Sequence, residues 1–515
     1  MTRAAPARSG RGRTGRLSPA EEKNIDVLVI GSGAAGLRAA IAARQGGATV
    51  LLLTKGTAGL GTATVMSYGA FNAAGSGFTT EEHARKTMET GHGKGNPSLV
   101  KILAEEAPAR IGELIGQGAR LRQTRFGFAA EGRFPILGRP ITETLLAWAK
   151  SAGVRITDWI TAVMLVTGGD GPHVAGCLGV TSGGKIVLVL AKAVVLCTGG
   201  ASALFRYHDN PVTNIGDGYA MAARCGALVA DMEFTQFYPL LISAERLPKI
   251  LAPPALVERG KVVNTLGEDV REKYGLADVK PVAAKGRDAL SVAVYTEQMQ
   301  GRNVYLDLRH AGGDSGAPGP EGEMLRMLEG RYHSASRPLP VTPCAHFTMG
   351  GVVIDEHCRT TRQGLFAAGE AACGVHGANR MGGNALTETL VFGYRAGKAA
   401  AAYCADGASG RTEDAASRDL PEIGRAYTAG THEPAAALRV LRETMWEHCG
   451  PVRHGEGLSF ALEVIEGLKR EGITCTGRER LAACWSVWNG LETASMMINA
   501  AIARKESIGA HWRRS

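Results

Sequence analysis

The sequence lacks any long apolar run and any paired-cysteine motif. No stretch of its 515 residues approaches the roughly eighteen apolar residues that a membrane span requires, so we expect no membrane span. The ten cysteines are scattered, with neither CxxC nor CxxCH spacing. This pattern argues against iron–sulfur, zinc and c-type haem sites, and no metal site is predicted. It favours a reducing compartment, and we predict a cytoplasmic location.

The N-terminal segment lacks the apolar core of a secretory signal. Its first twenty residues hold Arg3, Arg8, Arg11, Arg13 and Arg16 among glycine, serine and proline. We therefore predict a disordered basic tail over residues 1–22. The formal net charge of the whole chain is +9, and these five arginines account for much of it. Nucleic-acid binding is accordingly not predicted.

The residues that are abundant are typical of a large, ordered α/β protein. Hydrophobic residues make up 45% of the chain, and glycine occurs 69 times. A chain of 515 residues is too long for a single hydrophobic core, so two or three domains are expected.

A glycine-rich segment near the N-terminus predicts a dinucleotide-binding turn. Residues 25–30 have the pattern of a short apolar strand, and residues 37–44 that of an alanine-rich helix. The glycines between them allow a tight turn and bring backbone N–H groups against a pyrophosphate at the helix N-terminus. A second strand, residues 48–53, is followed by Thr54 and Lys55 rather than by the acidic residue that NAD-binding folds place there.

Later segments complete a flavin-site pattern. Residues 376–386 read HGANRMGGNAL, and they follow a strand-like segment, residues 364–369, that ends at Glu370. Residues 193–200 read as a buried strand that ends in a glycine turn, and residues 210–218 include Asp217. Together these segments resemble the succinate dehydrogenase/fumarate reductase flavoprotein family, which also contains L-aspartate oxidase. The resemblance extends from about residue 25 to the C-terminus.

The resemblance implies an α/β fold, with a Rossmann-like FAD-binding domain, an inserted α+β capping domain and a C-terminal helical region. It also implies FAD as the cofactor. Relatives in membrane complexes tether the flavin through a histidine, and Ala63 occupies the matching place here, so a non-covalent FAD is expected. The residues assigned to the cofactor are Gly31, Ser32, Gly33, Ala34, Ala35, Gly36, Thr54, Lys55, Thr62, Ser67, Tyr68, Gly69, Gly199, Asp217, Glu370, Ala385 and Leu386.

Three basic residues match the family's catalytic and substrate-binding positions. By resemblance, His346 and Arg380 hold one carboxylate of the substrate through charge-assisted hydrogen bonds. Arg287 is expected to exchange a proton with the substrate carbon opposite the hydride. Arg287, His346 and Arg380 are therefore the predicted catalytic residues.

The other end of the substrate site departs from the family's pattern. Tyr238 stands where relatives have a histidine, Pro253 where they have a proton-relay glutamate, and Leu256 where they have an arginine. Glu258 keeps its counterpart, so Tyr238 and Glu258 join His346 and Arg380 as predicted substrate-binding residues. A carboxylate lying against proline and leucine would be costly to desolvate. We therefore expect the protein to bind one carboxylate of the substrate, and we expect the group at the other end of the substrate to be less acidic, larger or apolar.

The predicted domain order follows from these placements. The FAD-binding domain comprises residues 23–238 and 346–405, and the capping domain residues 239–345. Residues 406–515 form a linker and a helical part, with helical apolar spacing over 438–448, 457–470 and 492–505. Hairpin turns are predicted at residues 168–171 and 183–184.

Three functional interpretations remain open from the sequence. The first is an FAD-dependent oxidoreductase that transfers a hydride between flavin N5 and a carboxylate-bearing small molecule, by C–C dehydrogenation or C=C reduction. The second is an aspartate-oxidase-like enzyme that oxidises a C–N bond. The third is a flavin subunit that depends on a partner protein for its electrons. The three differ in the electron donor or acceptor, which the sequence leaves unidentified.

Overall fold

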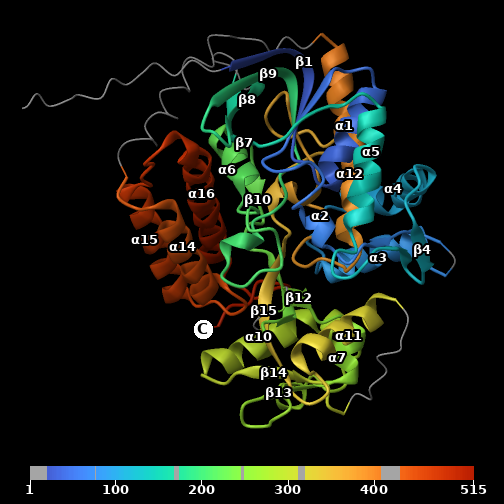
Figure 1. Cartoon of the computed structure of the whole chain (residues 1–515), viewed down its shortest axis with the longest axis vertical. Helices are drawn as coiled ribbons and strands as arrows, with labels where there is room; N and C mark the ends of the chain where they lie inside the picture. The colour runs from blue at the N-terminus through green and yellow to red at the C-terminus, as the bar shows by residue number, and fades with distance from the viewer. Residues whose placement is uncertain are drawn as a thin grey trace, which may run out of the picture.

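The structure, a computed structural model, describes residues 20–75, 77–167, 173–244, 247, 249–310, 319–407 and 430–514. Its largest unit is a seven-stranded sheet in the order β6-β2-β1-β9-β8-β7, with β17 also pairing with β9 (Figure 1). The strands β6, β2, β1, β9 and β17 run parallel, whereas β7, β8 and β9 form antiparallel pairs. Their bounds are β1 Ala20–Ile30, β2 Val50–Leu53, β6 Arg155–Thr157, β7 Ile160–Thr167, β8 Val174–Thr181, β9 Ile186–Leu196 and β17 Leu365–Ala367.

The first strand is longer than its sequence pattern predicts. The backbone of residues 20–22 pairs with residues 187–189 of β9, so β1 begins within the segment 1–22 that we predicted as a tail. This extension depends on a partner strand far along the chain, which the local sequence does not reveal. Residues 1–19 lie outside the described residues.

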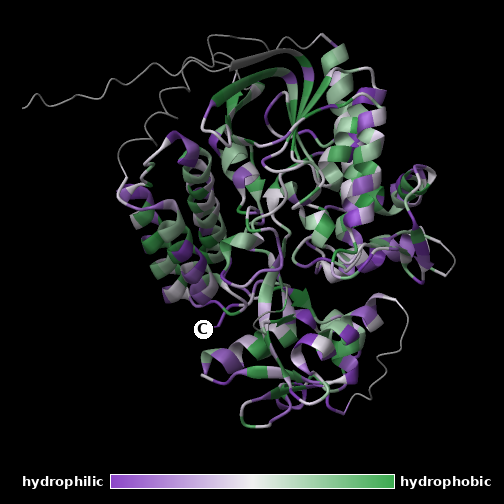
Figure 2. Ribbon diagram, viewed as in Figure 1, coloured by the Kyte–Doolittle hydropathy of each residue, from purple (hydrophilic) through white to green (hydrophobic). Residues whose placement is uncertain are grey.

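Helices cover both faces of the large sheet. On one face α1 (Ala34–Gln45) packs against α12 (Asn384–Ala405), with α5 (Arg139–Ser151) beside α1 (Figure 1). A Cβ at Gly397 of α12 would lie 2.0 Å from the Ala39 carbonyl oxygen of α1, so these two helices meet through small residues. On the other face lie α6 (Asp217–Arg224) and α16 (Leu481–Ala503). The green strands in the upper part of Figure 2 show that this sheet is apolar, and its residues belong to the largest hydrophobic cluster of the described residues.

Shorter elements extend below this sheet. A three-stranded sheet has the order β3-β5-β4, and a two-stranded one pairs β10 with β16. The strand bounds are β3 Ala70–Asn72, β4 Leu121–Thr124, β5 Gly127–Ala130, β10 Val229–Ala230 and β16 Gly351–Val352. The helices of this region are α2 (Ala63–Met66), α3 (Thr80–Thr90) and α4 (Pro97–Gly116), and the 3-10 turns are Ser202–Leu204 and Gly369–Ala371.

The cap, at the bottom of Figure 1, is an antiparallel sheet with helices and its own apolar core. The strand order is β12-β11-β15-β14-β13. The strands are β11 Thr235–Ile242, β12 Ile250–Leu251, β13 Lys261–Asn264, β14 Val304–Asp307 and β15 Leu339–Thr348. The helices are α7 Pro254–Arg259, α8 Val270–Lys273, α9 Val282–Lys285, α10 Arg287–Met299 and α11 Pro320–Tyr332. The boundaries that we predicted at residues 239 and 345 fall inside β11 and β15, the two adjacent strands through which the chain enters and leaves the cap.

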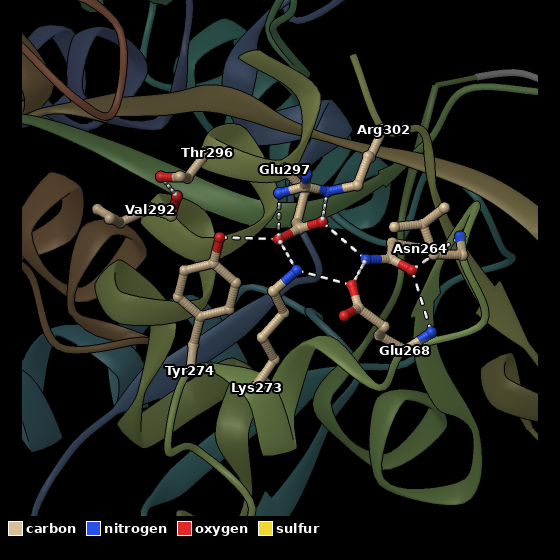
Figure 3. Close-up of polar contacts among 9 residues, drawn as sticks. Asn264, Glu268, Lys273, Tyr274, Val292, Thr296, Glu297 and Arg302 are labelled. Atoms are coloured by element: carbon tan, nitrogen blue, oxygen red, sulfur yellow. Dashed lines mark hydrogen bonds and ion pairs between the residues drawn. The ribbon is translucent and has the colours of Figure 1, made fainter. Parts of the chain in front are cut away.

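A buried carboxylate ties several cap elements together (Figure 3). The Glu297 side chain on α10 has no exposed surface and pairs with Arg302 at 2.5 Å and with Lys273 of α8 at 3.1 Å. Asn264 of β13 and the Tyr274 hydroxyl also donate to it, at 2.7 and 2.8 Å. Although burial alone would raise the pKa of Glu297, these hydrogen bonds, led by that from Arg302, lower it to about 2. The network therefore joins α10, α8 and β13 through one ionised group.

The C-terminal region is a group of helices beside the large sheet (Figure 1). Its helices are α14 (Pro434–Cys449), α15 (Gly455–Glu471) and α16, preceded by a 3-10 turn at Arg478–Arg480. The three predicted helical segments lie on α14, α15 and α16, although α16 begins earlier than predicted, at Leu481. The predicted turn at 168–171 and, from residue 408 on, the predicted linker lie outside the described residues. No described helix is long and apolar enough to cross a membrane.

Candidate active site

The turn between β1 and α1 has no room for a side chain at Gly31 or Gly36. Gly31 adopts a φ of +112°, and a Cβ there would lie 2.1 Å from the Cys197 carbonyl oxygen at the end of β9. A Cβ at Gly36 would lie 1.9 Å from the Gly31 carbonyl oxygen. Gly33 caps α1 without a side-chain hydrogen bond, and the N–H of Ala34 donates to the Thr64 hydroxyl at 3.1 Å. With Ala35, these residues form a narrow helix N-terminus whose backbone donors suit a diphosphate.

Polar contacts hold the strand ends around this turn. The Ser32 hydroxyl donates to Thr54 Oγ1 at 2.9 Å, which joins the turn to the end of β2. Lys55 Nζ forms an ion pair with Asp217 Oδ2 at 2.6 Å, at the start of α6. The structure thus brings together Ser32, Thr54, Lys55 and Asp217, which the sequence assigned to the cofactor separately.

The segment from Thr62 to Gly69 contacts the same turn through the hydrogen bond between the Ala34 N–H and the Thr64 hydroxyl. Thr62 caps α2 by accepting from the Val65 N–H at 3.4 Å, and Ser67 Oγ donates to the Thr64 carbonyl at 2.7 Å. Gly69 has a φ of +69°, and a Cβ there would lie 2.8 Å from the Ala130 Cβ. Ala63, at the start of α2, offers only a methyl group at the position of the relatives' tethering histidine. The Tyr68 hydroxyl crosses to the cap and donates to the Leu251 carbonyl.

Glu370 lies in a packed corner next to the large sheet. Its Oε1 accepts from the Thr348 N–H at 3.0 Å, and a Cβ at Gly200 would lie 2.1 Å from that same oxygen. Burial raises the pKa of Glu370 to about 8, although the Thr348 hydrogen bond and the nearby Arg380 charge act in the opposite direction. The neighbouring Gly199, with a φ of +74°, packs against Asn214. This carboxyl is therefore poised between its neutral and ionised forms near neutral pH.

The first turn of α12 is fixed by β3. Gly383 caps the helix with a φ of +93°, and a Cβ there would lie 2.4 Å from the Asn72 side-chain oxygen. Asn72 Nδ2 donates to the Gly382 carbonyl at 2.6 Å and to the Asn384 side chain at 2.9 Å. Ala385 and Leu386 follow directly within this clamped turn.

Two arginines converge between the FAD-binding domain and the cap. Arg380 is 6% exposed, its Nη2 donates to Gln236 Oε1 at 2.8 Å, and its Cζ lies 4.6 Å from the Phe347 ring centroid. Arg287, the first residue of α10, reaches the Arg380 carbonyl with Nη1 at 3.5 Å. The Nε atoms of both arginines are buried and have no hydrogen-bond partner within the described ranges. Burial and repulsion from Arg287 lower the pKa of Arg380 to about 9. Both features fit a site that is completed by an anion.

His346 lies at the end of β15 and is held by an aspartate. Its Nδ1 lies 2.7 Å from Asp209 Oδ2, and its ring centroid is 5.8 Å from that of Tyr238. Asp209 belongs to the loop 205–216, and no sequence motif singled it out. Gln236, the partner of Arg380, lies two residues before Tyr238 in a family-like segment, but the sequence assigned it no role. For Asp209, the sequence offers one indication: it directly precedes the family-like segment that starts at residue 210.

The far end of the site is apolar and phenolic. The Tyr238 hydroxyl donates to the Ala252 carbonyl at 2.7 Å, next to the Leu251 carbonyl that Tyr68 contacts. Tyr238 packs with Leu241, Leu251 and Cys344, and Tyr68 lies against this cluster.

The residues of the altered segment do not all face this cluster. Leu256 is fully buried in the cap core, and Pro253 precedes α7. Glu258 Oε1 accepts from the Val282 N–H at 2.7 Å, at the start of α9. The structure thus brings together Arg287, His346, Arg380 and Tyr238, whereas the Glu258 carboxylate is engaged within the cap.

Comparison with known proteins matches nearly the whole chain. Residues 26–386 match the family described as FAD binding domain, and residues 439–515 match fumarate reductase flavoprotein C-term. The chain is 34% identical to one of the subunits of the fumarate reductase (CoM/CoB) of Methanothermobacter marburgensis, over 95% of this chain and 94% of the relative. It is 32% identical to an L-aspartate oxidase of Streptomyces coelicolor, over 95% and 88%. Among solved structures, a point mutant of E. coli quinol fumarate reductase FrdA superimposes with a TM-score of 0.85 at 28% identity, covering 96% of this chain and 92% of that one.

Proposed function

The chain belongs to the succinate dehydrogenase/fumarate reductase flavoprotein family of FAD-dependent oxidoreductases, and we propose that its substrate is a small acid with one gripped carboxylate and a distal group that is not a carboxylate. The proposed reaction is dehydrogenation of a C–C bond or reduction of a C=C bond beside that carboxylate. When bound, FAD supplies the hydride acceptor or donor at its N5 position. The residues of the chain bind the acid, orient it and move the proton.

The two converging arginines, Arg380 and the half-buried Arg287, carry this proposal. Arg380 and Arg287 bring two guanidinium groups into one enclosed region, and each has a buried Nε without a partner in the described part of the chain. Burial lowers the pKa of Arg380, and repulsion between the two neighbouring cations lowers it further. An anionic carboxylate would relieve this repulsion and would accept the free N–H groups.

The orientation of the phenols supports a distal group other than a carboxylate. A backbone carbonyl can only accept, so the hydroxyls of Tyr68 and Tyr238 must both donate to Leu251 and Ala252. Each phenolic oxygen then offers only lone pairs to a ligand. Lone pairs repel a carboxylate, whereas they accept from an amide N–H or a hydroxyl. The Leu241, Leu251 and Cys344 side chains of the same cluster supply no charge to balance an anion.

Arg287 is the proposed proton donor in the reductive direction. Arginine remains protonated at neutral pH, so it gives a proton to a developing carbanion more readily than it removes one. Its Cζ lies 6.0 Å from the Tyr238 ring centroid, which puts the guanidinium between the two ends of the site. The Glu258 carboxylate accepts a hydrogen bond from the Val282 N–H. We therefore propose Glu258 as a substrate ligand only in an arrangement of the cap in which this hydrogen bond is broken.

We further propose that FAD is bound non-covalently and that the protein is cytoplasmic. Ala63 carries no nucleophile that could attach to the flavin. The ten cysteines are all buried and free, which is typical of a reducing compartment. The electron donor or acceptor is proposed to be external to this chain.

Anaerobic flavin spectroscopy tests the proposed substrate. The oxidised holoenzyme would be mixed with succinate and with succinamate, its monoamide, and the chemically reduced enzyme with fumarate and fumaramate. We expect flavin bleaching or reoxidation to be at least tenfold faster with the monoamides. Faster reaction with succinate or fumarate would refute the altered distal pocket, and no reaction with any of the four would refute the proposed substrate class.

A second candidate is oxidation of an amino acid at its C–N bond. The similarity to L-aspartate oxidase favours it, and so do the phenolic oxygens, because lone pairs also accept from an ammonium group. Release of hydrogen peroxide with an amino acid in air would support this candidate. Its absence, together with turnover of a monoamide, would exclude it.

A further inference from the structure

The His346 imidazole is held on one side and open on the other. Its Nδ1 lies 2.7 Å from Asp209 Oδ2, while Asn210 Nδ2 donates to Asp209 Oδ1 at 3.1 Å and to the His346 carbonyl at 2.8 Å. The Asp209 side chain is 14% exposed and that of His346 24%. Nε2 makes no hydrogen bond within the part of the chain that the structure describes, so it is free for a ligand.

This arrangement fixes which nitrogen carries the hydrogen. An ionised carboxylate only accepts, so Nδ1 must donate to Asp209. A neutral His346 then presents the lone pair of Nε2 to the site, and a lone pair repels a substrate carboxylate. Only the imidazolium, protonated on both nitrogens, can hold Asp209 and donate to a substrate oxygen at once.

We infer that Asp209 is a positioning residue that makes carboxylate binding depend on uptake of one proton at His346 Nε2. The inference rests on the proposed function, since it takes His346 and Arg380 as the carboxylate ligands. The proton comes from solvent and remains on the ring, balanced by the Asp209 charge on one side and the substrate charge on the other. Affinity for the acid therefore falls as the pH rises.

The other ionisable groups around the ring come from several elements, and none replaces Asp209. The groups packed around this corner are Tyr238 of β11, Arg287 of α10, Arg380, Glu370, and the Lys249–His208 pair at 3.1 Å. Arg287 and Arg380 oppose a charge on the ring, and Tyr238 is a neutral phenol whose pKa burial raises. Asp209 is the carboxylate in direct contact with the imidazole.

Proton uptake can be measured on the wild-type holoenzyme. Crotonate, an unsaturated monocarboxylate, is a suitable probe because it cannot reduce oxidised flavin. Its binding at pH 8 would be followed by calorimetry in buffers of different ionisation enthalpy. We expect net uptake of protons on binding and a dissociation constant that rises with pH. Binding without proton uptake would overturn the inference alone, whereas no binding at any pH would count against the proposed function.

Two variants separate positioning from simple structural support. Asp209→Ala frees Nδ1, so the neutral ring can carry its hydrogen on Nε2 and donate to the carboxylate without taking up a proton. Crotonate binding by this variant should therefore depend less on pH between 5 and 8 than binding by the wild-type protein. The matched control, Asn210→Ala, removes three hydrogen bonds of the neighbouring side chain but leaves the contact between Asp209 and the imidazole, so its pH profile should keep the wild-type shape. An equal loss at pH 5 and pH 8 for Asp209→Ala would refute the positioning role. If that variant does not fold, the proton count on the wild-type protein decides.

Discussion

The Glu370 carboxyl is expected to make FAD affinity depend on pH. Its pKa is raised to about 8, so at pH 7 about nine in ten apoprotein molecules carry a proton there. By resemblance, this residue is expected to accept a hydrogen bond from a cofactor ribose hydroxyl, and an ionised carboxylate accepts more strongly than a neutral acid. Ionising the group at pH 7, one unit below its pKa, costs about 1.4 kcal/mol.

The sign and size of the effect follow from this cost. Binding favours the deprotonated form, so the affinity for FAD rises with pH until about pH 8 and then levels off. The rise between pH 7 and pH 9 should be about tenfold. In Glu370→Gln the titrating group is gone, so the affinity should be constant over this range.

Reconstitution of the apoprotein provides the assay. FAD fluorescence is quenched on binding, and the dissociation constant would be measured at half-unit steps from pH 6 to 9 for both proteins. A wild-type dissociation constant that does not change with pH, or a Glu370→Gln variant that keeps the wild-type slope, would refute the assignment of Glu370 to the cofactor.

Four further predictions test other parts of the structure. Arg380→Met removes a buried cation that we propose as a substrate ligand, and kcat/KM should fall by an amount equivalent to about 2–5 kcal/mol while the purified protein retains its FAD; unchanged kcat/KM would contradict the proposed role. Glu297→Gln should lower the free energy of unfolding of the cap by about 2 kcal/mol, measured by urea denaturation, because Lys273 and Arg302 lose their counter-charge. Since the pKa of Glu297 is lowered from 4.5 to about 2, this stabilisation should be present above pH 4.5 and lost as the pH falls towards 2. Gly36→Ala places a Cβ within 1.9 Å of the Gly31 carbonyl, so the protein should purify with little FAD; a full FAD complement would show that the turn can open. Acid precipitation of the wild-type protein should leave all flavin in the supernatant, and flavin that stays with the pellet would indicate a covalent bond.

The sequence predicted the elements whose signals are local. The strand–turn–helix at Gly31 to Gly36 combines apolar runs with glycines where a Cβ has no space, and each feature is visible within a short window. The helical spacing of α14 and α15 is equally local. The cluster of Arg287, His346 and Arg380 could be anticipated only through resemblance, because these residues are far apart in the chain.

Contacts between distant segments could not be predicted from the sequence. Asp209 and His346 are separated by 137 positions, and nothing in either segment specifies the other. Glu258 matched a family position, yet its carboxylate bonds to the Val282 N–H, because Pro253 and Pro254 start a short helix that directs it there. The start of β1 at Ala20 likewise depends on a pairing partner in β9.

The two strands that connect the cap to the FAD-binding domain, β11 and β15, have an evolutionary consequence. Because β11 and β15 are adjacent and antiparallel, the chain enters and leaves the cap at neighbouring points of the FAD-binding domain. Gln236 lies at the first end and His346 at the second, so the partner of Arg380 and one proposed carboxylate ligand stay with the attachment, whereas Arg287 belongs to the cap. The residues beyond them can be exchanged as a block between relatives. A chimaera that joins another member's cap at these two strands would inherit a new distal pocket while keeping the cofactor site and the carboxylate grip.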